Sequence, residues 1–123
     1  ETLLELEVPK RAQYLRVIHL ELNRIMSHLV WLGTSMLDLG AVTVWWYCFR
    51  EREEILDLFE MTSGQRMHTR YIQVGGVMED VPSGFEAKLR AFLKLMPERV
   101  DQYLDLLNRN EIALNRLRNT WPL

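Results

Sequence analysis

Apolar residues recur at steps of three and four along the first third of the chain, which is the spacing of one helix face. This pattern predicts a helix over about 9–40, in which Pro9 suits the first turn and Gly40 suits the end. A second helix is predicted over 42–63, ending before Gly64. The apolar positions of the first helix are Leu15, Leu22, Ile25, Met26, Leu29, Leu32 and Met36.

The segment 64–83 interrupts the helical pattern. Gly75, Gly76 and Pro82 are turn signals, and the run RYIQV is compatible with a short extended piece. We therefore expect an irregular loop between the second and third helices.

A third helix is predicted over 84–108. Ser83 is a candidate N-cap, because Glu86 follows three positions later and completes a capping box. Pro97 is expected to kink or restart this helix. A short helix over 111–117 follows it. We therefore expect the whole 123-residue chain to be a single all-α unit, a bundle of three long helices plus a short C-terminal helix.

The stretch from Leu29 to Phe49 has one charged residue, Asp38, and the length of a membrane span. A carboxylate near the middle of a span costs about 2.5–3.5 kcal/mol on insertion scales. Gly33 and Gly40 also weaken a continuous helix there. We interpret the stretch as a helix end, a turn and a helix start, buried in protein or facing a lipid-like ligand, and not as a membrane span.

The second predicted helix is apolar on two opposite sides. At 100° per residue, one face groups Val42, Trp46, Phe49 and Leu56 around Glu53, and the other groups Val44, Ile55, Leu58 and Met61 around Glu51. Both faces are expected to be buried, and carboxylates on buried faces need partners. Two interpretations stay open for them, a solvated charged band and a buried ion network.

Composition narrows the function classes. A net charge of −2, with 48% hydrophobic residues, suits a globular domain without the basic surface typical of nucleic-acid binding. The single cysteine, Cys48, excludes an internal disulfide and a multi-cysteine metal site. No HExxH, Walker, GxGxxG or nucleophile-elbow motif occurs, so nothing supports hydrolysis. The chain starts without methionine, and we expect both ends to be cut from a longer protein.

Two of the three histidines have helical positions. His19 and His28 are nine positions apart, so they face opposite sides of a helix and cannot share a metal or a haem. We expect each to be an ordinary helix residue, which disfavours a haem-binding bundle.

The third histidine lies in the run GQRMHTRYIQVGGV, residues 64–77, which has no acidic residue. Arg66 and Arg70 flank His68, and like charges disfavour the imidazolium whereas an anion favours it. His68 is either a loop histidine with one backbone hydrogen bond or a group whose protonation follows a neighbouring anion. Asp38 is similarly either a helix-end residue or a functional group with a polar partner supplied from elsewhere.

The runs VPKRAQYLRVIHLELNRIMSHLVWLGTSMLDLGA, FREREEILDLFEMTSGQRMHTRYIQVGGV and DVP together resemble the 49-kDa-type (D) subunit of respiratory complex I, NADH:quinone oxidoreductase. That family is related to the large subunits of nickel–iron hydrogenases. The resemblance implies a helical core at the junction of the peripheral and membrane arms. It also implies a quinone cavity between this subunit and the neighbour that holds the terminal [4Fe–4S] cluster.

The resemblance implies two catalytic residues. His68 would accept a proton beside the cluster, and Asp38 would pair with a quinone-contacting histidine. Arg66 and Arg70 would add a positive field that favours reduction of the cluster. The implied wall of the quinone cavity contains Thr34, Asp38, Trp45 and Trp46, and the implied cluster-facing loop contains Arg66, His68 and Arg70. The family's usual TPFF reads TVWW here, which changes that wall.

The resemblance implies a part in quinone reduction by a proton-translocating complex, with the isolated chain inactive. No cofactor or metal is expected on this chain alone, because quinone is the substrate and the cluster belongs to the neighbour. The expected partners are that neighbour and the membrane-arm subunit at the quinone entrance, and self-association is open. The expected location is peripheral, on the cytoplasmic or matrix side of the energy-converting membrane. The alternative function is a purely structural helical scaffold for subunit assembly.

Overall fold

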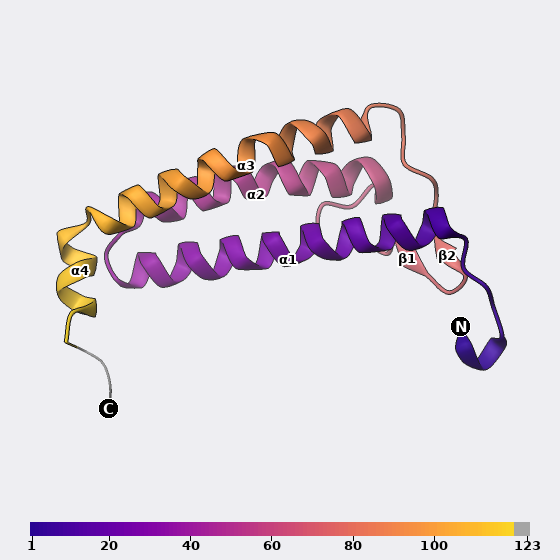
Figure 1. Cartoon of the computed structure of the whole chain (residues 1–123), viewed down its shortest axis with the longest axis horizontal. Helices are drawn as coiled ribbons and strands as arrows, with labels where there is room; N and C mark the ends of the chain where they lie inside the picture. Colours follow the sequence, from indigo (N-terminus) through magenta and orange to yellow (C-terminus); the bar gives the residue numbers. More distant parts are fainter. Residues whose placement is uncertain (120–123) are drawn as a thin grey trace.

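The computed structural model describes residues 1–119, which are mostly helical (Figure 1). The helices are α1 (Lys10–Asp38), α2 (Val42–Ser63), α3 (Phe85–Asn108) and α4 (Glu111–Leu117), preceded by the 3-10 turn η1 (Thr2–Leu4). The hairpin of β1 (Ile72–Gln73) and β2 (Gly76–Val77) connects α2 to α3. The mostly helical class predicted from the sequence is confirmed, and a small sheet is added to it.

The turn between α1 and α2 makes these helices antiparallel neighbours (Figure 1). α1 ends at Asp38, two residues before the predicted end, and the Ala41 N–H donates to the Met36 carbonyl at 2.8 Å. Gly40 has a φ of 91°, a left-handed conformation that favours glycine. The apolar stretch considered as a span is therefore divided between two helices. Within residues 1–119, no helix is both long enough and apolar enough to cross a membrane.

The start of α3 differs from the predicted capping box. Gly84, with a φ of 92°, is the N-cap, and no side chain caps the helix. Glu86 is therefore the second helical residue instead of the third, and the prediction for Ser83 is wrong. The alternative of a restart at Pro97 is wrong, because α3 continues through Pro97 as one helix to Asn108, whereas the alternative of a kink stays a prediction.

The connection predicted to be an irregular loop contains the β1–β2 hairpin, with Gly75 in a left-handed conformation at its turn. Arg16 of α1 holds this hairpin, because its Nε donates to the Gly76 carbonyl at 2.9 Å and its Nη2 to the Gln73 carbonyl at 2.7 Å. Glu1 binds Arg16 and accepts from the Gly75 N–H, and the Arg16 hydrogen bond is the largest cause that lowers the pKa of Glu1 to about 2. Arg16 lies 57 to 60 positions before its carbonyl partners, so no local pattern could have indicated this contact.

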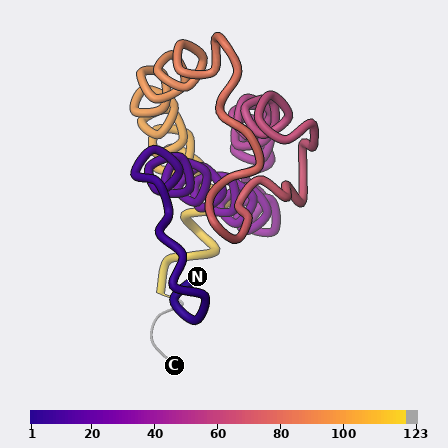
Figure 2. Tube along the Cα trace, turned by 90° about the vertical axis from the view of Figure 1, so that its right-hand side faces the viewer, coloured from indigo at the N-terminus to yellow at the C-terminus, as the bar shows by residue number. Residues whose placement is uncertain are grey.

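The core lies along α2, which packs against both α1 and α3; Figure 2 shows the three long helices end-on as a triangle. The prediction that both faces of α2 are buried is right for the face around Glu51 and wrong for the face around Glu53, where Val42 and Trp46 are exposed and Leu56 is buried. The buried residues of α2 are Val44, Cys48, Glu51, Ile55, Leu56, Leu58, Phe59 and Thr62. α4 lies beside the α1–α2 turn, where Ala113 is buried and Arg116 donates to the Asp38 carbonyl at 3.0 Å. The bundle therefore has two distinct ends, one with the α1–α2 turn and one with the hairpin.

Candidate functional site

The predicted site residues fall into two groups at opposite ends of the α1–α2 pair. Thr34, Asp38, Trp45 and Trp46 lie around the turn, and Arg66, His68 and Arg70 follow the end of α2. His68 lines a pocket together with Asn23 of α1, and Asp38 is 15 positions farther along the same helix. At 1.5 Å per residue that separation is about 22 Å along the helix axis. The chain therefore does not bring the two predicted catalytic residues together.

At the turn end, Trp45 lies against Gly33. A Cβ added to Gly33 would be only 3.3 Å from Trp45 Cδ1, so glycine permits the close approach of the two helices. The Trp45 ring meets Trp46 edge-on at 4.6 Å between centroids. Trp46 is 62% exposed, and Thr34 is exposed with its hydroxyl donating to the Val30 carbonyl at 2.8 Å. This end of the bundle is an open aromatic surface.

Asp38 is exposed at the last position of α1. Its carboxylate makes no hydrogen bond or ion pair with any residue in the described range 1–119, and Arg116 binds its backbone carbonyl instead. A carboxylate at a helix C-terminus is disfavoured by the helix dipole. The polar partner expected for Asp38 is therefore not supplied by residues 1–119.

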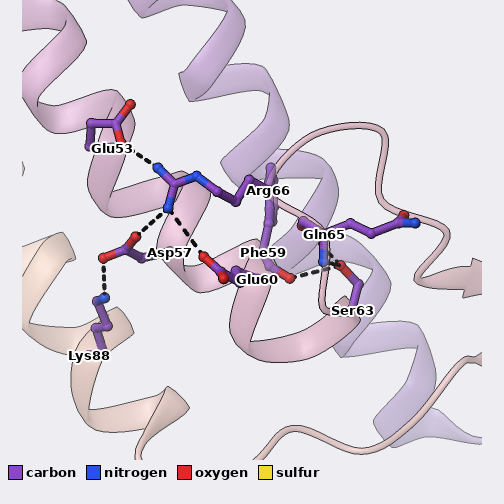
Figure 3. Close-up of polar contacts among 8 residues, drawn as sticks. All are labelled: Glu53, Asp57, Phe59, Glu60, Ser63, Gln65, Arg66 and Lys88. Carbon is purple, nitrogen blue, oxygen red and sulfur yellow. Dashed lines mark hydrogen bonds and ion pairs between the residues drawn. The ribbon is translucent and has the colours of Figure 1, made fainter.

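Arg66 is not the bare positive charge that its local sequence indicated. Its Nη1 lies 2.9 Å from Asp57 Oδ1 and 3.2 Å from Glu60 Oε2, and its Nη2 binds Glu53 (Figure 3). Lys88 of α3 donates to the second oxygen of Asp57 at 2.8 Å. Hydrogen bonds from Lys88 and then Arg66 hold the pKa of Asp57 below its usual value. The acidic residues that the loop lacks are thus supplied by α2.

His68 is exposed, and neither it nor Arg70 forms a hydrogen bond or ion pair with another residue of the described range 1–119. Its φ of 54° places its backbone in the left-handed region. The imidazole lines a pocket of about 360 Å³, whose wall also includes His19, Asn23 and Tyr71. His19 and Tyr71 are the titratable groups among the other residues that line this pocket.

A buried stack lies beneath this loop. The Tyr71 ring packs on His19 at 4.0 Å between centroids, and Tyr71 is 1% exposed. His19 Nδ1 donates to the Leu15 carbonyl at 2.9 Å, and its Nε2 is 2.9 Å from Thr62 Oγ1. Burial lowers the pKa of His19, so the neutral ring is favoured. No sequence signal connected His19 to the loop, although its position four residues after Leu15 places it on the apolar face of α1.

The two carboxylates on the faces of α2 have different environments. Glu51 is buried; the Tyr103 hydroxyl donates to its Oε2 at 2.5 Å, Arg50 Nε to its Oε1 at 2.6 Å, and Arg99 Nε is 3.4 Å from Oε1. Burial raises the pKa of Tyr103. Glu53 is exposed and pairs with Arg66. The buried ion network is therefore right for Glu51, and the solvated band is right for Glu53.

The residues of this chain do not fit an iron–sulfur cluster of their own. Cys48, the single cysteine, is buried, and its burial raises its pKa to about 11, which disfavours the thiolate that binds metals. Among residues 1–119, no group of three or more His, Cys, Asp or Glu is arranged to hold a metal ion.

In comparisons with known proteins, the chain is similar to subunits of NADH-quinone oxidoreductase. The family model for the respiratory-chain NADH dehydrogenase 49 Kd subunit matches residues 38–121. The chain is 51% identical over 118 residues to the D 1 subunit of NADH-quinone oxidoreductase from Solibacter usitatus, an alignment that covers 96% of this chain and 29% of the relative. It is 55% identical over 116 residues to the D 2 subunit from Roseiflexus sp. (94% and 28%), and 53% identical over 118 residues to the D-type subunit from Thermus thermophilus (96% and 29%). The chain thus spans about three tenths of the length of these relatives.

Proposed function

Because the chain belongs to the family of the respiratory-chain NADH dehydrogenase 49 Kd subunit, we propose that it forms part of the quinone-reducing core of an NADH:quinone oxidoreductase. The proposal assigns the loop at the hairpin end to an interface with a neighbouring subunit that holds a [4Fe–4S] cluster. It assigns the surface at the turn end to the wall of a quinone cavity. The observation that carries the proposal is the exposed His68, which has no hydrogen-bonding or ionic partner in residues 1–119.

His68 is the proton-accepting group of this proposal. The neighbour's cluster supplies the electron, and its reduction adds negative charge near the loop. An imidazole beside growing negative charge gains proton affinity, because the charged form is then favoured. His68 has no ion pair within residues 1–119 that would compensate its charge.

The turn end contributes binding and orientation. Exposed aromatic rings such as that of Trp46 offer flat apolar area to a quinone ring. Asp38 presents an unpaired carboxylate at the same end and would bind a cationic or hydrogen-donating partner from outside residues 1–119. Other subunits would close the cavity, including one of the membrane arm. This incomplete wall is why we expect the isolated chain to be inactive, with no cofactor bound by it alone.

The test is His68→Met in the assembled complex, with His28→Met as the matched control, because His28 is an exposed histidine of α1 outside both groups. Loss of the imidazole is expected to abolish the pH dependence of the cluster's midpoint potential. His28→Met is expected to leave that dependence unchanged. A His68→Met complex with the normal pH dependence would remove His68 from this role.

A structural scaffold for subunit assembly is the second candidate. It is favoured by a groove of about 740 Å³ between α1 and α3, lined in part by Ile18, Leu89 and Leu93. Leu93 is 50% exposed, and Leu104, farther along α3, is 51% exposed, so apolar area remains for a partner or a second copy. In a pure scaffold His68→Met would be silent, and the same experiment therefore separates the two functions.

A further inference from the structure

We propose that Arg66 is a positioning residue that fixes the His68 loop on α2, whereas Arg70 is the arginine of this loop that presents positive charge outward. The inference rests on the proposed function of His68. It replaces the simpler view that both arginines act as one positive field.

The charge of Arg66 is used within the chain. Glu53, Asp57 and Glu60 follow one another at four and three positions, so they share one face of α2, and the Arg66 guanidinium binds all three (Figure 3). The whole cluster, with Lys88 on Asp57, has three carboxylates against two cations. It therefore presents no excess positive charge to a neighbour.

Arg70 differs from Arg66 although the two are only four positions apart. Arg70 is exposed and has no ion pair or hydrogen bond with any residue of the described range 1–119. Its charge is therefore available to an anionic group outside this chain. The two arginines that flank His68 in sequence thus have different electrostatic roles.

The loop is held on both sides of His68. On one side, the Gly64 N–H donates to the Glu60 carbonyl at 2.8 Å, and Arg66 binds the carboxylates of α2. On the other side, the buried Tyr71 ring stacks on His19. Four residues, 67–70, separate Arg66 from Tyr71, and each extends the chain by at most about 3.6 Å. The position of His68 is therefore set by two anchors, one charged and exposed, one aromatic and buried.

The backbone of His68 gives an independent reason to expect that both anchors are needed. Its φ of 54° is uncommon for a residue other than glycine, although histidine is among the residues that tolerate it. Such conformations persist where the surrounding structure holds them. Release of the Arg66 anchor would let this backbone relax and move the imidazole.

The variant Arg66→Lys distinguishes the effect of anchoring the loop from the effect of the positive charge. A lysine keeps the positive charge but has one compact ammonium in place of the planar five-donor guanidinium. It cannot reproduce contacts from two nitrogens to three carboxylates. If Arg66 acted only by charge, Arg66→Lys would be neutral.

The experiment uses the assembled complex with Arg66→Lys, and with Arg109→Lys as the matched control, because Arg109 is an exposed arginine that forms an ion pair with Asp105 and lies outside both groups of site residues. Hydrogen exchange is measured for the amides of Gly64 and Gln65, which donate to the Glu60 carbonyl at 2.8 Å and to the Ser63 hydroxyl at 3.2 Å. The midpoint potential of the neighbour's cluster is measured against pH. Arg66→Lys is expected to raise the exchange rate by about fivefold, the effect of losing one exposed ionic contact. It is also expected to lose the pH dependence of the potential, although the net charge is unchanged. Arg109→Lys is expected to retain both normal exchange and normal pH dependence.

Unchanged exchange in Arg66→Lys would overturn the anchoring role. Faster exchange with an intact pH dependence would overturn the positioning role, since the contact would then be merely structural. Faster exchange in Arg66→Lys together with an unaltered pH dependence in His68→Met would support the anchor and overturn the proposed function of His68 instead.

Discussion

Two ionic clusters on α2 have opposite compositions and opposite environments. In the Glu51 network, one carboxylate meets two arginines, Arg50 and Arg99, and the hydroxyl of Tyr103. In the Arg66 cluster, one guanidinium meets three carboxylates, and one of these also binds Lys88. The Glu51 side chain is 3% exposed, whereas the Arg66 side chain is 41% exposed.

The difference shows that burial, more than the number of ion pairs, decides what a cluster does. A charge as buried as Glu51 is costly without its partners, so this network locks α3 to α2 through Arg99 and Tyr103. An exposed cluster contributes little to global stability because water and salt screen it. The Arg66 cluster can therefore orient a loop without being essential to the fold.

The largest effect is expected for Glu51→Gln. The neutral amide leaves the partly buried Arg99 without its carboxylate, and breaking a buried ion pair costs about 3–5 kcal/mol. The measurement is urea unfolding of the 123-residue chain, and the loss is the difference in free energy of unfolding between the variant and the unsubstituted chain. Glu54→Gln is the control, because Glu54 is exposed and has no partner in residues 1–119; its expected change is below about 0.5 kcal/mol. Similar losses in the two variants would refute the distinction.

A smaller effect is expected for Arg66→Gln. Because the cluster is exposed, the variant should lose less than about 1 kcal/mol of its free energy of unfolding at low salt. In about 1 M salt, where the screening length is about 3 Å, this loss should nearly vanish, whereas the loss in Glu51→Gln should persist. Urea unfolding at both salt concentrations checks this. If Arg66→Gln lost the same free energy of unfolding at both salt concentrations, burial would not explain the difference between the two clusters.

The smallest effect is expected from acid titration of Asp57. Lys88 and Arg66 hold its pKa below the usual value of 3.8, so the unfolded chain binds this proton more readily than the folded chain. The stabilisation is fully present above about pH 3.8 and is lost as the pH falls through the lowered pKa. Asp57→Asn should flatten this acid limb of the stability curve, while Asp101→Asn, at an exposed position without a partner in residues 1–119, should retain it. Identical acid limbs in the two variants would contradict the assignment.

The sequence predicted what depends on neighbours along the chain. The bounds 42–63 and 111–117 are confirmed for α2 and α4, and the apolar pattern of α2 correctly placed Glu51 in a buried face. The Ser83 capping box failed because Gly84 took the cap conformation one residue later. That error shifts the start of one helix by a single residue.

What the sequence could not predict depends on contacts between distant positions. The hairpin is held by Arg16, and the stack beneath the loop joins His19 to Tyr71. Arg66 looked unpaired in the sequence because its carboxylates lie 6 to 13 positions earlier, on a helix that folds back beside the loop. The assignments of His68, Asp38 and the tryptophans to catalysis and quinone binding stay predictions, since residues 1–119 give His68 and the Asp38 carboxylate no hydrogen-bonding or ionic partner that would test them.

The length of α2 has a further consequence. Its 22 residues span about 33 Å, and the same uninterrupted helix bears Trp46 near one end and the carboxylates of the Arg66 cluster near the other. The helix therefore fixes both the separation and the relative rotation of the residues at its two ends. Adding one residue within it would advance the far end by about 1.5 Å and rotate it by about 100° relative to the near end, so the two ends could no longer both keep their faces against α1 and α3. Evolution could therefore vary the side chains along this helix more freely than it could vary their number.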